Sequence, residues 1–427
     1  PWPKPIKPRN QAAKRQFRLH GYFTRQGWNV VQHYVKHFTK KGDLVLDPFG
    51  GGGATLIEAM MTDRKAIHID LNPFSVFMTE ALIEPVDMVA MQKAFERVKN
   101  NFEKNCPQTE TEFDAVLEKY YYPKGIKLSK DADVDVVEDL FTKKQLAQLA
   151  YLRHLIMRIR KKAIKKSLLL AFSSSVTKIN KTYHASSSRG DNAGNAAAFA
   201  YYRYRIAKKE VDLSVIDVFT IKYKRLIAAK KEMEVAINEK TIKNAEIIKG
   251  DATDLSNIEK ESIDYIYTDP PYGKKIAYLD LSAMWNAWLN LKVTKSDFKK
   301  EAIEGGSLNK SADEYCDLIR KSIEEMYKVL KFGRWMSFVF SHKDPKYWHL
   351  IVETAEIVGF EYAGVVKQSN GQSSFKKRQN PFSVLSGQLI INFRKVKTPQ
   401  AIQKTILGVE VYEIIIETIE STIAEHN

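Results

Sequence analysis

Residues 40–73 read KKGDLVLDPFGGGGATLIEAMMTDRKAIHIDLNP, and this stretch decides the fold. The apolar run at 44–46 predicts a short buried strand, the glycines at 50–53 predict a turn, and residues 54–62 predict a helix. A second apolar run at 65–69 predicts another strand. A strand, a helix and a strand in this order form the unit of a parallel sheet with a right-handed crossover, so we expect an α/β protein.

The sheet pattern returns only in the second half of the chain. The third strand is predicted within NAEIIKGDATDL (244–255), and further strands are predicted at 263–267, 334–340, 360–368 and 386–395. Between the halves, apolar positions at helical spacing predict helices at 86–104, 142–166 and 214–238, and the polar run at 173–195 predicts a loop. About 155 residues are too many for an ordinary crossover, so we expect a mostly helical inserted domain. The predicted organisation is a sheet domain in two parts (1–85 and 241–395), an inserted domain (86–240) and a C-terminal helical extension (396–427).

The composition limits the classes of function. Lys and Arg number 67 against 51 Asp and Glu, so the net charge is +16, which favours a polyanionic partner such as nucleic acid over a generically basic soluble protein. The two cysteines, Cys106 and Cys316, exclude a disulfide framework and a Cys-rich zinc site, which suits a reducing cytoplasm. No run of about 18 uncharged apolar residues predicts a membrane span. We therefore expect a cytoplasmic protein with no membrane contact.

Three acids and the glycine run predict a ligand site at one edge of the sheet. The glycines let a ligand approach the backbone at the start of a helix, where N–H groups are free. Asp47 ends the first strand and suits a cationic or hydroxyl-bearing ligand better than a pyrophosphate, Asp70 ends the second and suits ribose hydroxyls, and Asp251 follows the third and suits an adenine amino group. Each acid alone is more often a helix cap or a turn residue, but three at successive strand ends favour a binding site.

A second cluster, Asp269, Pro270, Pro271 and Tyr272, follows the strand predicted at 263–267. Neither proline has a backbone N–H, so the strand must stop here in a stiff turn. A carboxylate, a free carbonyl and a flat ring together could hold an amino group on an aromatic base. The alternative is a strand end with an ordinary proline turn.

Together these motifs closely resemble the S-adenosylmethionine-dependent amino-DNA methyltransferases. The resemblance covers 20–85 and 241–395 and rests on LDPFGGGGATLIEA, AIHIDLNP, KGDATDL and YTDPPYG. The family's first motif falls on Asp47, Pro48, Phe49, Gly51, Gly53 and Thr55, with Gly52 and Ala54 as small departures. Phe23 and Thr24 resemble the segment that holds the methionine end of the cofactor. The resemblance implies a Rossmann-like class I methyltransferase sheet, S-adenosylmethionine as the cofactor and no metal.

The resemblance also implies the chemistry of the second cluster. Asp269 and the Pro270 carbonyl would accept hydrogen bonds from the amine of a base turned out of the duplex, and Tyr272 would stack on that base. Asp rather than Ser at position 269 favours adenine N6. Cytosine N4, guanine N2 in RNA or tRNA, and a non-catalytic recognition subunit are the alternatives. In the commonest arrangement with a mid-sheet target-recognition domain the insertion follows the third strand, whereas here it follows the second.

The insertion is the basic part of the chain. Residues 151–190 contain ten Lys and Arg and no Asp or Glu. We expect Lys161 and Lys165 to contact phosphates; the alternative is that they form a solvated face of a helix. We expect Arg189, Asn192 and Arg203 to read base edges; the alternative is a surface loop beside a core aromatic cluster. A second basic loop at 370–381 is a further candidate. The expected partner is double-stranded DNA, and a restriction or defence-system protein is a further candidate partner.

Overall fold

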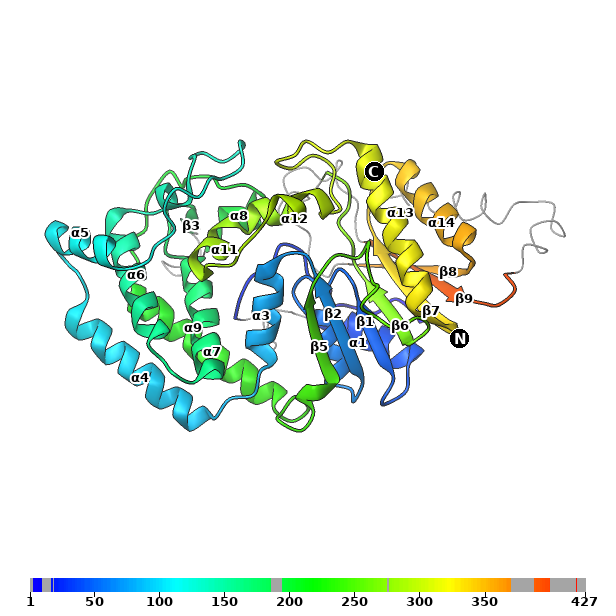
Figure 1. Cartoon of the computed structure of the whole chain (residues 1–427), viewed down its shortest axis with the longest axis horizontal. Coiled ribbons are helices and arrows are strands. Elements are labelled where there is room, and N and C mark those ends of the chain that lie inside the picture. Colours follow the sequence, from blue (N-terminus) through cyan, green and yellow to red (C-terminus); the bar gives the residue numbers. More distant parts are fainter. Residues whose placement is uncertain are drawn as a thin grey trace.

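The computed structural model describes residues 3–9, 17, 19–185, 194–274, 276–369, 388–399 and 420. Within these ranges the chain forms a sheet flanked by helices and, beside it, a lobe built mainly of helices (Figure 1). None of the described helices is long and apolar enough to cross a membrane. The loop at 370–381 and nearly all of the predicted extension at 396–427 lie outside the described residues.

The sheet confirms the predicted α/β, Rossmann-like fold. Its seven strands lie in the order β5-β2-β1-β6-β7-β9-β8. The first five of these run parallel, and β9 runs antiparallel to both of its neighbours. The strands are β1 (Leu44–Asp47), β2 (Lys65–Asp70), β5 (Ala245–Lys249), β6 (Ile263–Thr268), β7 (Leu330–Phe340), β8 (Phe360–Gln368) and β9 (Gln388–Lys395). The strand order reverses between β1 and β6, and open α/β sheets bind ligands beyond the strand ends at such a point.

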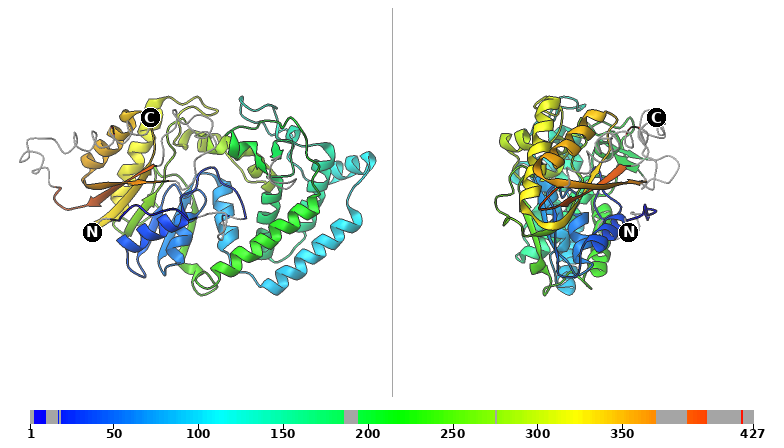
Figure 2. Two further views of the ribbon diagram at one scale, coloured as in Figure 1. Left: turned by 180° about the vertical axis from the view of Figure 1, so that it is seen from behind. Right: turned by 90° about the vertical axis from the view of Figure 1, so that its right-hand side faces the viewer.

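Helices cover both faces of the sheet (Figure 2). Successive residues of β1 serve opposite faces, since Val45 packs into one hydrophobic cluster and Leu46 into the other. The first cluster holds α1 (Trp28–Phe38), α2 (Ala54–Met60) and α3 (Pro73–Ile83), and the second holds α13 (Ala312–Val329) and α14 (Pro345–Val358). Because β1 is buried on both faces, its sequence is a continuous apolar run.

The helical lobe follows α3 and precedes β5. It contains α4 (Met88–Asn105), α5 (Glu110–Lys119), η3 (Val137–Leu140), α6 (Lys143–Met157), α7 (Lys162–Val176), β3 (Tyr183–Ala185), β4 (Gly194–Ala196), α8 (Ala197–Ala200) and α9 (Val215–Met233), and η4 (Ile242–Asn244) leads into β5. After β6 the chain passes back to this lobe through α10 (Tyr278–Leu281) and α11 (Ala283–Leu289) and then forms α12 (Lys295–Lys300). The lobe therefore receives two separate segments of the chain.

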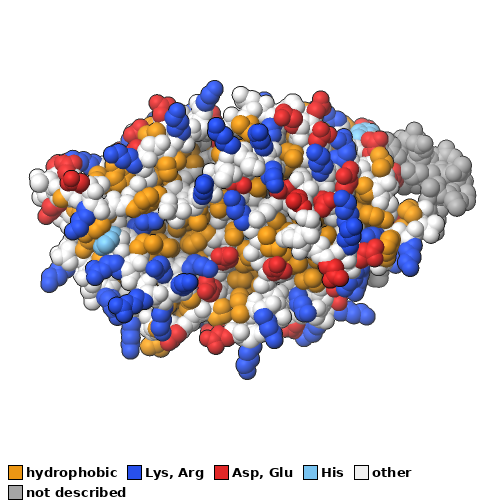
Figure 3. Space-filling view, in the orientation of Figure 1, with side chains coloured by type: hydrophobic (Ala, Val, Ile, Leu, Met, Phe, Trp, Pro, Cys, Tyr) orange, Lys and Arg blue, Asp and Glu red, His pale blue; other side chains and the backbone are white. Residues whose placement is uncertain are grey.

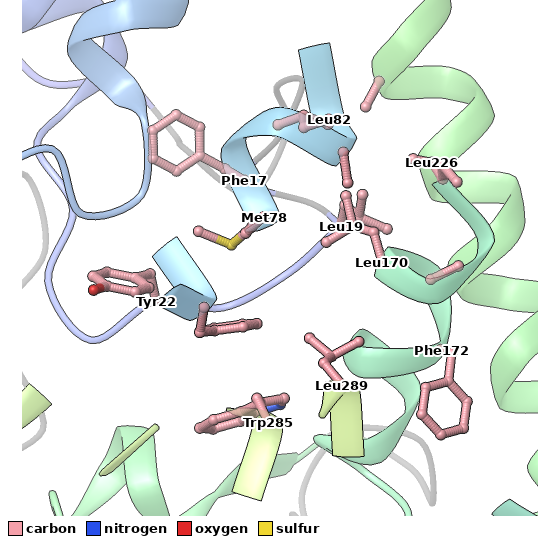
Figure 4. Packing of buried hydrophobic residues seen from close by; sticks show 14 of the residues in the cluster. Phe17, Leu19, Tyr22, Met78, Leu82, Leu170, Phe172, Leu226, Trp285 and Leu289 are labelled. Carbon is pink, nitrogen blue, oxygen red and sulfur yellow. The ribbon is translucent and has the colours of Figure 1, made fainter. Parts of the chain in front are cut away.

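The helical lobe and the sheet lobe share one hydrophobic core. Figure 4 shows Leu170 of α7 and Leu226 of α9 facing Met78 and Leu82 of α3, with Leu19 between them. All five side chains are buried. A continuous apolar core favours a fixed relation between two lobes, because separating them would expose that surface to water.

Two expectations for the insertion are wrong. The single helix predicted at 142–166 is broken, since α6 ends at Met157 and α7 begins at Lys162. The loop predicted from residue 173 begins later, because α7 continues to Val176. The serines that suggested a loop are buried in α7, where the Ser173 hydroxyl donates to the Leu170 carbonyl at 2.9 Å and that of Ser175 to Ala171 at 2.8 Å. With their hydroxyls satisfied inside the helix, these serines no longer disfavour it.

Candidate active site

A pocket opens at the carboxyl ends of β1, β2, β5 and β6. It encloses about 910 Å³ including its open mouth. Its wall combines the glycine turn, the N-terminal segment before α1, the four strand ends and the C-terminal end of α12. The lining residues include Tyr22, Thr24, Arg25, Gln26, Asp47, Phe49, Gly50, Gly51, Gly52, Asp70, Asp251, Asp269, Pro271, Tyr278, Lys300 and Glu301. The four aspartates expected at strand ends therefore line one cavity.

Glycine is required at the turn for steric reasons. A Cβ atom at Gly50 would lie 2.2 Å from Nδ1 of His68, whose ring is fully buried beneath the turn. Gly53 has a φ of 74°, and a Cβ there would lie 2.7 Å from the Thr79 hydroxyl. Gly53 thus allows the start of α2 to approach Thr79 of α3. It is not among the pocket residues, whereas Gly50, Gly51 and Gly52 expose their backbone to the cavity.

Asp47 is buried at the end of β1 and is held by three donors. The Thr55 hydroxyl donates at 2.6 Å, the Thr268 hydroxyl at 3.1 Å and the Phe49 N–H at 3.2 Å. Burial raises the pKa of Asp47 to about 7 in spite of these bonds, and the charge of Asp269 adds to the rise. A cation brought into the pocket would favour the ionised form of Asp47.

Asp70 holds the glycine turn in place. Its carboxylate accepts hydrogen bonds from the Gly51 N–H at 2.6 Å and from the Asn72 N–H at 2.7 Å. Burial raises the pKa of Asp70 to about 6. The same carboxylate lines the pocket, so it is placed to accept from hydroxyl groups of a ligand as well as from the backbone.

Asp251 is paired with a cation that the sequence did not reveal. Lys300 Nζ lies 2.9 Å from Asp251 Oδ2, and the Thr253 N–H donates to Oδ1 at 3.0 Å. Lys300 ends α12, and both residues line the pocket. No local pattern could have identified Lys300, since it lies 49 residues from Asp251 in the chain.

The N-terminal segment reaches the pocket through residues other than Phe23. Phe23 is buried in an aromatic cluster, with ring centroids 5.3 Å from Phe199 and 6.1 Å from Trp285, and it is not among the pocket residues. Thr24 does line the pocket, and its hydroxyl lies 3.0 Å from the Tyr278 hydroxyl. Tyr22 also lines the pocket and was not anticipated.

Of the cluster after β6, Asp269 and Pro271 line the pocket, whereas Pro270 and Tyr272 are not among the pocket residues. The Tyr272 hydroxyl donates to Asp269 Oδ1, and the Tyr272 ring meets Phe340 edge to face at 5.1 Å. Burial and the Asp269 charge raise the pKa of Tyr272 well above its usual value, so its hydroxyl remains a donor. The Pro271 carbonyl accepts from the Tyr315 hydroxyl at 2.7 Å, which fixes the proline turn.

The residues expected to contact DNA have different environments. Lys161 is exposed just before α7, and Lys165 is half-buried on that helix. The Arg203 guanidinium lies 2.5 Å from Asp133 in an ion pair, and the Arg203 side chain is 43% exposed. Arg189 and Asn192 lie outside the described residues.

Two other residues of this region stabilise the fold. Lys166, one of the ten basic residues of 151–190, bridges Glu80 and Glu84 at 3.2 and 3.0 Å and so ties α7 to α3. Tyr204, which lies between Arg203 and Arg205 in the sequence, is fully buried, and its hydroxyl accepts from the Met284 N–H at 3.1 Å. Lys and Arg side chains are spread over both lobes on the face shown in Figure 3.

The pocket fits an elongated cationic ligand that carries hydroxyl groups and an aromatic base. A Cβ at Gly51 would lie 3.3 Å from the Tyr22 ring and one at Gly52 2.9 Å from the Arg25 side chain, so the bare backbone of the turn keeps space open against the N-terminal segment. Acidic side chains surround that space, and the Phe49 ring adds an apolar surface. These features match a sulfonium amino acid joined to a nucleoside.

Comparisons with known proteins agree with this description. A family model described as DNA methylase matches residues 2–80, which include the glycine turn, Asp47 and Asp70. The type II methyltransferase M.MvaI of Kocuria varians is 23% identical over 321 residues, 70% of this chain and 62% of that protein. The type II methyltransferase M.MjaII of Methanocaldococcus jannaschii is 27% identical over 152 residues, 34% of this chain and 28% of that protein. The chain thus spans less than two thirds of the length of either relative.

Among solved structures, the rRNA methyltransferase aviRa of Streptomyces viridochromogenes aligns over 88% of each chain, with 10% identity and a TM-score of 0.31. A TM-score of 0.31 does not establish a shared fold. The fold is defined by the strand order and the strand directions.

Proposed function

We propose that this chain is an amino-DNA methyltransferase with S-adenosylmethionine as its methyl donor, and that it methylates the N6 amino group of adenine in duplex DNA. One observation carries the proposal. Asp269 lines the same cavity as the glycine turn and the three acids Asp47, Asp70 and Asp251. A carboxylate able to hold an amino group therefore stands beside a site that fits the cofactor.

Different pocket residues would bind different parts of the cofactor. Thr24, Tyr22 and Asp47 would hold the methionine end, where Asp47 offers a negative charge to the ammonium group. Asp70 would accept from the ribose hydroxyls, and Asp251 from the adenine amino group. When bound, the cofactor supplies an electrophilic methyl group on a sulfonium centre.

The residues after β6 would make the target amine reactive. The exocyclic amine of adenine is a poor nucleophile because its lone pair is delocalised into the ring. Hydrogen bonds from its two N–H groups to Asp269 and to the Pro270 carbonyl would direct the lone pair toward the methyl group. Such positioning and electrostatic stabilisation are strong when the accepting groups are held rigidly in a water-poor site.

The target base must leave the duplex to reach Asp269. Tyr272 would stack on this base; its hydrogen bond to Asp269 and its ring contact with Phe340 support the proposal, because they keep the ring next to the carboxylate. We propose that the helical lobe, with Lys161 and Lys165, positions the DNA and that the segment around Arg189, Asn192 and Arg203 reads the sequence. The ion pair of Arg203 with Asp133 would have to open for that role.

The test is to incubate the protein with S-adenosylmethionine and unmethylated duplex DNA and to analyse the product nucleosides by mass spectrometry. We expect N6-methyladenine from the wild-type protein and none from Asp269→Ala, while both bind the cofactor in calorimetry. N4-methylcytosine alone would select the cytosine enzyme, and N2-methylguanine formed only in RNA would select the RNA enzyme. Cofactor binding with no methylation of either nucleic acid would favour a non-catalytic recognition subunit.

A further inference from the structure

Three residues far apart in the sequence meet at the catalytic carboxylate. The Gln26 side-chain amide, from the segment before α1, donates to Asp269 Oδ2 at 2.6 Å. The same Nε2 donates at 3.0 Å to Oε1 of Gln388, the first residue of β9. Gln388 donates back to Oε1 of Gln26, so the two amides form a reciprocal pair.

The Asp269 carboxylate selects the orientation of the Gln26 amide, and the amide pair supports it. A glutamine amide has a donor end and an acceptor end, and only the donor end can bond an ionised carboxylate. If the Gln26 amide alone turned over, its oxygen would face Asp269 and each end of the Gln388 amide would meet a group of its own kind. Gln388 therefore stabilises, through two further hydrogen bonds, the orientation in which Gln26 presents N–H to Asp269.

Gln26 and Tyr272 hold the Asp269 carboxylate from opposite oxygens. Gln26 donates to Oδ2 and the Tyr272 hydroxyl donates to Oδ1. Two donors on opposite oxygens fix the plane of the carboxylate, and they favour its ionised form.

We propose that Gln26 is a positioning residue for methyl transfer, which orients Asp269 toward the target amine, and that Gln388 acts only through Gln26. The proposal rests on the proposed function and adds to it a requirement for the N-terminal segment and for β9.

A neighbouring contact supports the same requirement. Gln368, the register partner of Gln388 on β8, donates to the Ile6 carbonyl at 2.7 Å and accepts from the Ile6 N–H at 3.3 Å. The ends of β8 and β9 thus hold the N-terminal segment at two points.

The first test compares Gln26→Met with a matched control. Methionine keeps the length of the side chain and removes the amide. Loss of a hydrogen bond to a charged group predicts a decrease in kcat of about 10- to 100-fold, with KM for S-adenosylmethionine changed by less than about two-fold. The control is Gln32→Met, because Gln32 makes a similar amide–carboxylate bond, to Glu58 at 3.0 Å, outside the pocket. Its kcat should stay at the wild-type value when assayed below its unfolding temperature.

Two further measurements separate positioning from a structural role. The acid limb of the pH profile of kcat should move to higher pH in Gln26→Met, because the ionised carboxylate has lost a donor. Gln388→Met should lower kcat by a smaller factor than Gln26→Met does. In the double variant the Gln388 change should have no additional effect, since its partner is already absent.

The possible failures are distinguishable. A wild-type protein that methylates no DNA base would overturn the proposed function and this inference with it. An active wild-type enzyme whose Gln26→Met variant behaves like Gln32→Met would overturn the inference alone. An increase in KM for S-adenosylmethionine with unchanged kcat would also overturn it, because Gln26 would then be a cofactor contact. Additive effects in the double variant would refute the dependence of Gln388 on Gln26.

Discussion

Lys300 Nζ lies 2.9 Å from Asp251 Oδ2, so a cation from the end of α12 accompanies the carboxylate proposed to bind the adenine of the cofactor. Asp251 is buried and Lys300 is half exposed. An ion pair to a buried carboxylate fixes the orientation of that carboxylate. The charge of a half-exposed lysine is screened by water, so it adds little to the binding energy. Lys300 is thus expected to aim Asp251 and to contribute little to binding by its charge.

Replacement of the two residues should therefore have unequal effects. Asp251→Ala should weaken S-adenosylmethionine binding by about ten-fold or more, because a hydrogen bond to a charged group is lost. Lys300→Met should weaken it less, since Asp251 remains and still accepts from the Thr253 N–H at 3.0 Å. Titration calorimetry on both variants measures this difference. Tighter binding by Lys300→Met would mean that the lysine competes with the cofactor for Asp251.

Asp47→Ala should weaken cofactor binding by about 1.5–3 kcal/mol, because it removes the acid expected to meet the ammonium group. Asp43→Ala is the matched control at the opposite end of β1, where Asp43 pairs with Arg334 at 3.2 Å. Its affinity should equal that of the wild-type protein in calorimetry. Equal affinities for all three proteins would contradict the assignment of Asp47.

Cofactor binding should depend on pH in a definite direction. Burial raises the pKa of Asp47 to about 7 and that of Asp70 to about 6, so both are partly protonated in the free protein at mildly acidic pH. A cationic ligand favours their ionised forms, so binding should release protons and affinity should increase from about pH 5.5 to 7.5. Calorimetry at pH 6.5 in two buffers of different ionisation enthalpy measures the protons released. Asp47→Asn should release fewer, and uptake of protons would refute the sign.

Lys161→Ala should weaken binding to all DNA sequences alike and reduce the slope of log affinity against log salt by about one unit, as expected for one lost phosphate contact. Lys41→Ala is the control, because Lys41 is exposed and pairs with Asp63 at the opposite edge of the sheet. Arg203→Ala should instead relax discrimination at one base position by about 1–3 kcal/mol. Affinities for cognate and scrambled duplexes at several salt concentrations distinguish these outcomes. If Arg203→Ala lowers both affinities equally, Arg203 contacts only the backbone.

Lys230→Met should destabilise the fold by about 1–3 kcal/mol. Lys230 is buried on α9, and its ammonium group donates to the carbonyls of Ala81, Leu82 and Glu84 at 2.8, 3.1 and 2.7 Å, where α3 ends. The variant leaves these carbonyls without that donor at the junction of the two lobes. Urea unfolding measures the loss, and Lys231→Met, at an exposed neighbouring position, should have no effect. An unchanged free energy of unfolding in Lys230→Met would show that water replaces the ammonium group.

Local sequence determined the sheet and the positions of its acids. Apolar runs of strand length, a glycine turn and short connections predicted β1, α2 and β2, and the structure confirms them. Because the strands are parallel, acids at their carboxyl ends had to meet at one edge, and the two prolines had to end β6 near Asp269. These features depend on residues close together in the chain, whose conformations and spacing can be read directly.

Only the tertiary structure decided which distant side chains complete the site. Gln26 reaches Asp269 from 243 residues away, and Gln388 of β9 bonds Gln26. Lys300 reaches Asp251 from a separate helix. The same holds for the serines of α7, which suggested a loop but are buried, and of which Ser174 donates to the Leu19 carbonyl of the N-terminal segment. Such contacts arise from packing between elements, and a single sequence contains no periodicity or spacing that specifies them.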